Sequence, residues 1–163
     1  MNLVLVRVDD RLIHGQVVGG WLPVIQAERI VVASDRAAGD SLQTGLMRLA
    51  VPDHVAVDVL TVARAAAVLK DNLWEKERVL LLLPGVEELA RLVEAGAPVT
   101  QVNLGGLHDA PGREMVAPHL AFTAAERALL AGLLKRGLSF DTRPLPGDSS
   151  VPLGELVPNL GKS

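Results

Sequence analysis

The sequence predicts a single-domain α/β fold: a doubly wound, mostly parallel sheet of about six to seven strands with helices on both faces. Short apolar runs alternate along the chain with segments of helical periodicity, an order typical of parallel β-α-β units. The 163 residues suit one domain. Only two Trp, two Phe and no Tyr are present, so Val, Leu, Ile and Ala must form the core, as in sheets covered on both faces.

Apolar runs rich in Val, Leu and Ile have the length and composition of strands. The run at 78–84 is apolar throughout, which is typical of the centre of a parallel sheet, whereas the run at 54–60 alternates. A less regular stretch at 107–122 is predicted to hold short strands and turns. The strands are predicted at residues 3–8, 29–34, 54–60, 78–84, 98–106 and 138–145.

Segments with helical spacing fill the intervals between these strands. Leu42, Leu46 and Leu49 keep the spacing of one helical face. Thr61 and Thr123 are predicted N-caps, and Ser34 is predicted to cap the helix that follows the second strand. The helices are predicted at residues 13–25 (with Pro23 weakening the last turn), 38–50, 61–74, 85–96 (with Gly96 as a C-cap) and 123–137.

The single domain is expected to span residues 1–163, with a Pro/Gly-rich C-terminal arm from about residue 146 and a short helix near 153–157. The apolar residues of this arm predict a face covered either by the arm itself or by a second chain, and we expect a homodimer. These residues are Leu153, Leu156, Val157 and Leu160.

Composition and charge exclude several classes of protein. A formal net charge of −3 and few aromatic residues argue against a nucleic-acid-binding protein. The chain has no cysteine, which excludes disulfides and thiolate metal sites. Its N-terminus lacks the pattern of a signal peptide, and its apolar runs fall short of the ~20 residues that span a bilayer. We expect a cytoplasmic protein that can still work beside a membrane partner.

The stretch DDRLIHG at residues 9–15 concentrates the chemistry of the sequence directly after the first strand. In open parallel sheets, ligands bind at the carboxyl ends of the strands. A helix N-terminus attracts anions, and the guanidinium of Arg11 matches phosphate oxygens. His14 is a nucleophile at neutral pH, and Gly15 permits close approach of a ligand. The two aspartates can hold the imidazole in one tautomer or pair with Arg11, so these residues together suit a histidine that carries a phosphoryl group.

Two other interpretations of this stretch are open. Asp9, Asp10 and Arg11 can form a solvated ion-pair turn, with His14 as an ordinary helix-start residue. A metal-assisted hydrolase would use His14 together with His108, Asp109 or His119, although nothing in the spacing of these residues demands a metal.

A second loop is expected at the same edge of the sheet, after the strand at 98–106. Its glycine amides can face phosphoryl oxygens while Asn103 fixes the loop, although a simple strand-ending turn would look similar. The segment lacks the G-x-G-x-x-G pattern of dinucleotide-binding proteins. The residues concerned are Asn103, Gly105, Gly106 and His108.

The motif VRVDDRLIHGQV at residues 6–17 closely resembles the signature of the IIB component of the mannose/fructose/sorbose family of the bacterial phosphoenolpyruvate-dependent sugar phosphotransferase system (PTS). Further segments are similar to other parts of that family, at residues 29–52, 78–108 and 133–146. The segment VVGGW keeps the family's Trp, here Trp21, but has two glycines where members often carry Ser or Thr. The resemblance implies a doubly wound, mostly parallel sheet.

The resemblance also implies a function. His14 would accept a phosphoryl group, at Nδ1, from a phosphohistidine on a IIA domain and pass it to a sugar translocated by the membrane subunits IIC and IID. Arg11 would clamp the phosphate and Asp10 would orient the imidazole or Arg11. The backbone at Gly15 and Gln16 would form an anion cradle, with Asn103, Gly105 and Gly106 as a second wall of the site. No metal or organic cofactor is expected. The alternative is a regulatory phosphocarrier or an anion-binding module of the same fold without sugar transport.

Overall fold

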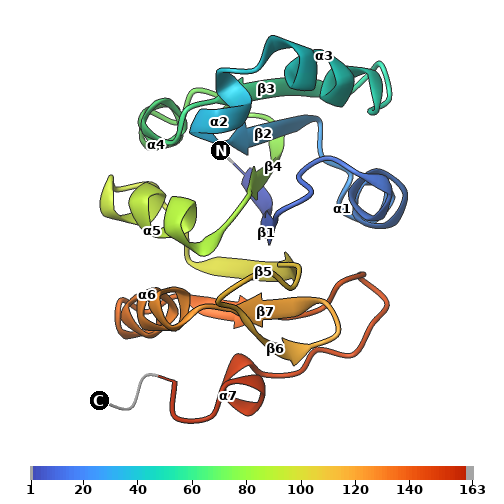
Figure 1. The fold of residues 1–163 in the computed structure, drawn as a ribbon. Helices are drawn as coiled ribbons and strands as arrows, with labels where there is room; N and C mark the ends of the chain where they lie inside the picture. Colours follow the sequence, from blue (N-terminus) through green and yellow to red (C-terminus); the bar gives the residue numbers. More distant parts are fainter. Residues whose placement is uncertain (1, 161–163) are drawn as a thin grey trace.

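A six-stranded parallel sheet forms the centre of the molecule (Figure 1). The computed structural model describes residues 2–160. The strands are β1 (Asn2–Asp9), β2 (Arg29–Ala33), β3 (Ala56–Leu60), β4 (Arg78–Leu83), β5 (Gln101–Gly106) and β8 (Ser139–Asp141). Their order across the sheet is β3-β2-β4-β1-β5-β8, and every pairing is parallel.

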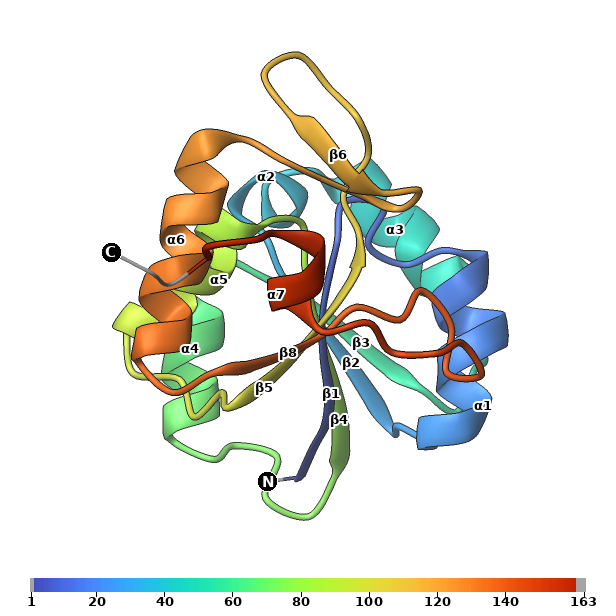
Figure 2. The same ribbon diagram turned by 90° about the horizontal axis from the view of Figure 1, so that it is seen from below.

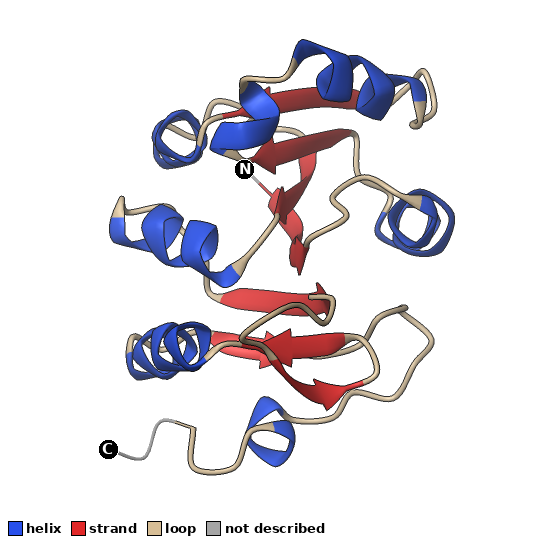
Figure 3. Ribbon diagram, viewed as in Figure 1, coloured by secondary structure: helices blue, strands red, loops and turns tan. Residues whose placement is uncertain are grey.

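Helices cover both faces of this sheet (Figure 3). Three of them pack on one face: α4 (Val62–Lys70), α5 (Val86–Glu94) and α6 (Ala124–Lys135). The opposite face carries η1 (Gln16–Trp21), α1 (Leu22–Ile25), α2 (Asp35–Ala38) and α3 (Ser41–Leu49). Residues 79–83 of the central strand β4 are completely buried between the two layers. The predicted fold class is therefore confirmed.

The irregular stretch after β5 holds the short strands and turns that the sequence predicted, and the structure pairs the two strands as an antiparallel hairpin. Its strands are β6 (Glu114–Ala117) and β7 (Leu120–Phe122), and the hairpin stands out from the body of the domain (Figure 2). Phe122 and Leu120 are buried at its base, where they join the core under α6. The hairpin thus extends the edge of the sheet at which β5 ends.

Side-chain caps fix the starts of the helices that were predicted from them. The hydroxyls of Ser34 and Thr61 accept hydrogen bonds from the backbone N–H of Ala37 and Arg64. Thr123 forms a full capping box with the helix α6 that it precedes. Gly96, with φ of +91°, follows α5 in the left-handed conformation that ends a helix.

The first helix differs from the continuous α-helix predicted at residues 13–25. It begins after Gly15 as the π-helical segment η1 and becomes α-helical only at Leu22. The wider π turn includes Gly20, whose missing Cβ would lie 2.6 Å from Leu145 Cδ2. Glycine at this position therefore lets the C-terminal arm approach the first helix closely. Leu12, with φ of +57° and its side chain buried, lies within the preceding loop and anchors it to the core.

The predicted helix at residues 38–50 is also divided. Asp40 caps α3 by accepting a hydrogen bond from Gln43 N–H, and this cap separates α3 from α2. The face marked by Leu42, Leu46 and Leu49 is turned to solvent, whereas Met47 on the other side is buried. The regular spacing identified the helix but not the face that it buries.

The C-terminal arm packs on the chain's own core. Leu153, the first residue of α7 (Leu153–Leu156), and Val157, directly after this helix, are buried, and Leu156 and Leu160 pack against the same cluster. These side chains therefore do not require a second chain to cover them. Residues 161–163 of the predicted arm and residue 1 of the predicted domain lie outside the described residues. Within residues 2–160, no helix is long and apolar enough to cross a membrane.

Candidate functional site

The DDRLIHG stretch lies at the carboxyl edge of the sheet, next to the point where the connections after the parallel neighbours β1 and β5 go to opposite faces. The loop after β1 leads to η1 and α1 on one face, and the hairpin after β5 leads to α6 on the opposite face. The two loops are joined by the Asp10 N–H, which donates to the Gly106 carbonyl at 3.0 Å. Such a reversal of strand order opens a crevice that binds ligands in doubly wound folds.

His14 is held in one tautomer at this edge. Its Nε2 lies 2.9 Å from Asp9 Oδ2, and its Nδ1 accepts a hydrogen bond from the Gln16 N–H at 3.3 Å. The Asp9 carboxylate only accepts hydrogen bonds, and the Gln16 amide only donates. Both contacts therefore place the proton of the neutral imidazole on Nε2 and leave the lone pair on Nδ1. His14 is partly exposed, and the space around the missing Cβ of Gly15 is open.

The buried Asp9 carboxylate contacts the side chains of Arg7, Arg11 and His14. Arg7 Nη2 donates to its Oδ2 at 2.9 Å, and Arg11 donates from Nε and Nη2 at 3.2 Å. Burial acts to raise the pKa of Asp9, but the hydrogen bonds from Arg11 and His14 and the charge of Arg7 outweigh it and hold that pKa below its usual value. Asp9 is therefore ionised at neutral pH.

Burial is also the main reason why the pKa of His14 lies below its ordinary value. The hydrogen bond and charge of Asp9 act in the opposite direction, while the positive charges of Arg11 and Arg7 lower the pKa further. The imidazole is thus neutral and nucleophilic at neutral pH, beside a local excess of positive charge that suits an anion.

The structure corrects the position expected for Asp10. The side chain that contacts both His14 and Arg11 is Asp9, because Asp9 is the last residue of β1 and points to the same face as the site. Asp10 turns away instead: its Oδ1 lies 2.5 Å from His108 Nδ1, and its Oδ2 accepts the backbone N–H of His108 at 2.8 Å. Arg113 lies 3.7 Å from the same carboxylate.

Of the other residues expected to bind phosphate, Gln16 lies at the site itself. Its Oε1 accepts a hydrogen bond from Arg11 Nη2 at 2.8 Å, so the side chain and backbone of Gln16 contact Arg11 and His14 respectively. Gly106 lies beneath Asp9 and Arg11, with its ideal Cβ position 3.2 Å from atoms of each.

Asn103 and Gly105 lie behind this first group and contact Arg7. The Asn103 Oδ1 accepts a hydrogen bond from Arg7 Nη1 at 2.7 Å, and its amide nitrogen donates to Asp141 Oδ2 and the Arg143 carbonyl. A Cβ on Gly105 would lie 2.0 Å from Arg7 Cζ. Both residues therefore position Arg7, and the expectation that they form a second wall of a phosphate site stays a prediction.

The sequence interpretation missed Arg7 and favoured the wrong aspartate. The signal was present: Arg7 and Asp9 alternate with Val6 and Val8 along a buried strand. Since alternate residues of a strand share a face, two opposite charges at this spacing predict a buried pair.

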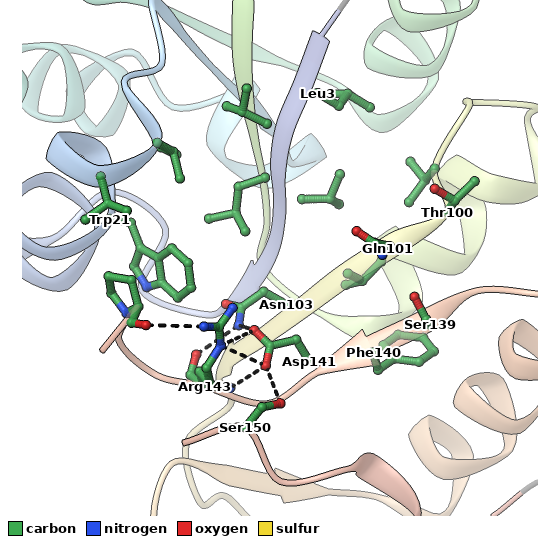
Figure 4. A pocket seen from close by; sticks show the side chains of 18 of the residues that line it. Leu3, Trp21, Thr100, Gln101, Asn103, Ser139, Phe140, Asp141, Arg143 and Ser150 are labelled. Carbon is green, nitrogen blue, oxygen red and sulfur yellow. Dashed lines mark hydrogen bonds and ion pairs between the residues drawn. The ribbon is translucent and has the colours of Figure 1, made fainter. Parts of the chain in front are cut away.

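A cleft of about 720 Å³ lies beside this network, over the part of β1, β5 and β8 that η1 and α1 leave open (Figure 4). Trp21, Asn103 and Arg143 line one end of it. Arg11 and His14 do not line this cleft, so the histidine site lies outside it. Among the described residues, no group of three or more His, Cys, Asp or Glu side chains is placed to hold a metal ion.

Fold and site together define a doubly wound α/β protein with a neutral histidine, oriented by a buried carboxylate, at the switch point of its sheet. The family model for the sorbose-subfamily IIB component of the PTS matches residues 3–162. The fructose-specific EIIB component of Bacillus subtilis (strain 168) is 31% identical over 162 residues, which cover 99% of both chains.

Two further comparisons agree with these matches. The mannose-specific EIIAB component of Escherichia coli (strain K12) is 32% identical over 162 residues, and this chain spans 50% of its length. The crystal structure of the IIBSor domain of the sorbose permease from Klebsiella pneumoniae superimposes with a TM-score of 0.90 at 29% identity, covering 96% of each chain. The chain belongs to the mannose/fructose/sorbose family of PTS IIB components. It is a sugar-phosphotransfer component and hence a phosphotransferase.

Proposed function

We propose that the chain carries a phosphoryl group on Nδ1 of His14, accepts it from a phosphohistidine on a IIA domain and passes it to a sugar during uptake. The observation that carries this proposal is the 2.9 Å contact between Asp9 Oδ2 and His14 Nε2. It leaves Nδ1 as the nucleophilic nitrogen, next to the open space at Gly15.

The transfer balances without a cofactor. The Nδ1 lone pair of His14 attacks phosphorus, and the P–N bond of the donor breaks as its electron pair returns to the IIA imidazole. The Nε2 proton stays in place, and Asp9 stabilises the positive charge that the imidazole gains. Arg11 and the Gln16 N–H then face the phosphoryl oxygens. In the second step a sugar hydroxyl oxygen attacks phosphorus and releases its proton to water. The P–N bond to His14 breaks and its electron pair returns to Nδ1, so the imidazole is neutral again with its proton on Nε2.

The partners in this proposal are a phosphorylated IIA domain, the membrane subunits IIC and IID, and a sugar of the mannose, fructose or sorbose type. A relative that joins IIA and IIB in one chain supports the IIA partner. We place the chain in the cytoplasm, at the inner face of the membrane when bound to IIC and IID, as a protein-phosphohistidine–sugar phosphotransferase. The homodimer predicted from the sequence stays a prediction.

Intact-mass measurement at neutral pH after incubation with the phosphorylated IIA domain of the same organism tests the carrier step. The wild-type protein should gain one phosphoryl group that mild acid removes, and His14→Ala should gain none. Gain of the group by both proteins, or by neither, would remove His14 as the carrier.

Asp9→Asn and Asp10→Asn form a matched pair for the site geometry. Asp9→Asn should lose most of the transfer rate because the imidazole loses its orienting acceptor, whereas Asp10→Asn should retain it. Addition of membranes that contain IIC and IID, together with sugar, then distinguishes a sugar phosphotransferase from a regulatory phosphocarrier. Sugar phosphate should appear; phosphorylated His14 without sugar phosphate would show the regulatory phosphocarrier instead.

A further inference from the structure

Arg7 is a fully buried guanidinium directly behind the histidine site. Its Nη1 donates to Asn103 Oδ1 at 2.7 Å and to the Pro144 carbonyl at 3.0 Å. Its Nη2 donates to Asp9 Oδ2 at 2.9 Å and to Gln16 Oε1 at 3.4 Å. A buried charge is costly unless it is paired and hydrogen-bonded, so this set of partners fixes the guanidinium in one place.

The surrounding backbone and rings form a slot for this side chain. Gly105 lies against it with no room for a Cβ, which would meet Cζ, Nη1 and Nε at 2.0 to 2.4 Å. The Trp21 ring lies 5.5 Å from Arg7 Cζ, and the Trp21 indole N–H donates to the same Pro144 carbonyl at 2.9 Å. The Arg7 Nε is buried without a hydrogen-bond partner in the described part of the chain. The slot therefore holds the guanidinium through its two terminal nitrogens.

Arg11 binds the same carboxylate, but its side chain is partly exposed to solvent whereas that of Arg7 is buried. It binds Asp9 over longer distances, 3.2 Å from both Nε and Nη2, and its side chain is 36% exposed, against 0% for Arg7. Water can replace the contacts of Arg11, but not those of Arg7. Of the two arginines on Asp9, only Arg11 can leave at small cost.

We propose that Arg7 is a positioning residue, the permanent counter-ion of Asp9, which frees Arg11 to exchange Asp9 for the phosphoryl group on His14. This inference rests on the proposed function of His14. When the phosphoryl group arrives, Arg11 turns to its oxygens, and Arg7 keeps Asp9 ionised and bonded to Nε2. Without Arg7, the departure of the Arg11 side chain would leave the buried carboxylate with His14 and the Arg11 backbone N–H, which donates to Asp9 Oδ1 at 3.0 Å, but with no permanently charged partner. The Arg11 side chain would therefore stay on Asp9.

A double-mutant cycle tests this division of roles, with phosphoramidate as a small-molecule phosphoryl donor and intact mass as the readout. Arg7→Gln and Arg11→Gln should each lower the rate of His14 phosphorylation by roughly 10- to 100-fold, the range of a lost charged hydrogen bond. The double variant should be little slower than either single variant, because each change prevents the same exchange. Multiplicative losses would show independent roles and overturn the proposal.

The pKa of His14, followed by NMR of the imidazole in unphosphorylated protein, gives a readout that a purely structural role would not move. Loss of the Arg7 charge should raise the pKa of His14, and Arg7→Lys should restore most of the shift. Arg29→Gln is the matched control, since Arg29 also binds two carboxylates, Asp58 and Glu77, and packs over a Trp ring, 4.9 Å from Trp74. It should lower stability and leave the pKa of His14 and the rate unchanged.

The outcomes separate failure of this inference from failure of the proposed function. If the wild-type protein accepts no phosphoryl group from either IIA or phosphoramidate, the carrier function fails, while the NMR titration still tests Arg7 as the counter-ion. If folded Arg7→Gln leaves the pKa of His14 unchanged, the counter-ion role is wrong even where transfer occurs. Should Arg7→Gln not fold, Arg7→Lys is measured in its place: lysine keeps the positive charge, so the rate should stay within a few-fold of the wild type, and a loss of rate of roughly 10- to 100-fold in folded Arg7→Lys would overturn the counter-ion role.

Discussion

Substitution of Gly105 by alanine tests the rigidity of the site with a single methyl group. The added Cβ would lie 2.0 Å from Arg7 Cζ and 2.2 Å from Nη1, far inside van der Waals contact. Arg7 must then leave its bonds to Asp9, Asn103 and Pro144. Separating one partner from a buried ion pair costs about 3–5 kcal/mol. For a domain of this size that loss corresponds to a fall in Tm of roughly 6–20 °C.

Thermal and urea unfolding of Gly105→Ala and Gly132→Ala, compared with the wild type, measure this effect. Gly132, in α6, is the matched control because its Cβ would meet nothing within 4 Å, and alanine there should stabilise the helix by about 0.5–1 kcal/mol. The two variants add the same atoms and should shift Tm in opposite directions. Equal stability of Gly105→Ala and the wild type would refute the reasoning, since it would show that Arg7 moves aside freely.

Three further predictions concern packing, pH and the C-terminal arm. Met47→Ala should destabilise the fold by about 2–5 kcal/mol in urea unfolding, whereas Leu49→Gln should change it by less than about 0.5 kcal/mol, because only Met47 is buried. The folded protein holds the pKa of His14 below 6.5, so the unfolded chain takes up this proton first. The free energy of unfolding should therefore fall as the pH drops below about 6.5, and the fall should be smaller in His14→Gln. Trp21→Phe removes the indole donor to Pro144 and should speed amide hydrogen exchange at Leu145, Gly147 and Asp148; unchanged exchange would mean that this bond does not hold the arm.

Much of the fold could be predicted from the sequence because local signals and packing agree there. The apolar run of β4 is buried on both faces, and the Ser34, Thr61 and Thr123 caps form as their positions indicate. The position of His14 at the carboxyl edge also follows from strand order, since the loop after β1 must emerge there.

Choices between two faces were harder to predict. Helical spacing located α3, but Leu42, Leu46 and Leu49 face solvent, because burial depends on which side of the helix meets the sheet. The same ambiguity affected the two aspartates. Adjacent Asp9 and Asp10 point to different sides, and the alternation of side chains along β1 decides which of them contacts His14. The π-helical turns of η1 and the pairing of Arg7 with Asn103 depend on packing between distant segments, which no local pattern encodes.

The Pro144 carbonyl that binds both Arg7 and Trp21 has a kinetic consequence. Arg7 is separated from Pro144 by 137 positions and from Asn103 by 96, so the residues that complete the site are among the most distant pairs in the chain. Contacts of such long range close late and slowly during folding. Although His14 and its neighbours are contiguous in the sequence, Arg7 gains its partners behind His14 only after β5, β8 and the following loop have docked. With His14 as the proposed carrier, partly folded molecules of this protein should therefore accept no phosphoryl group.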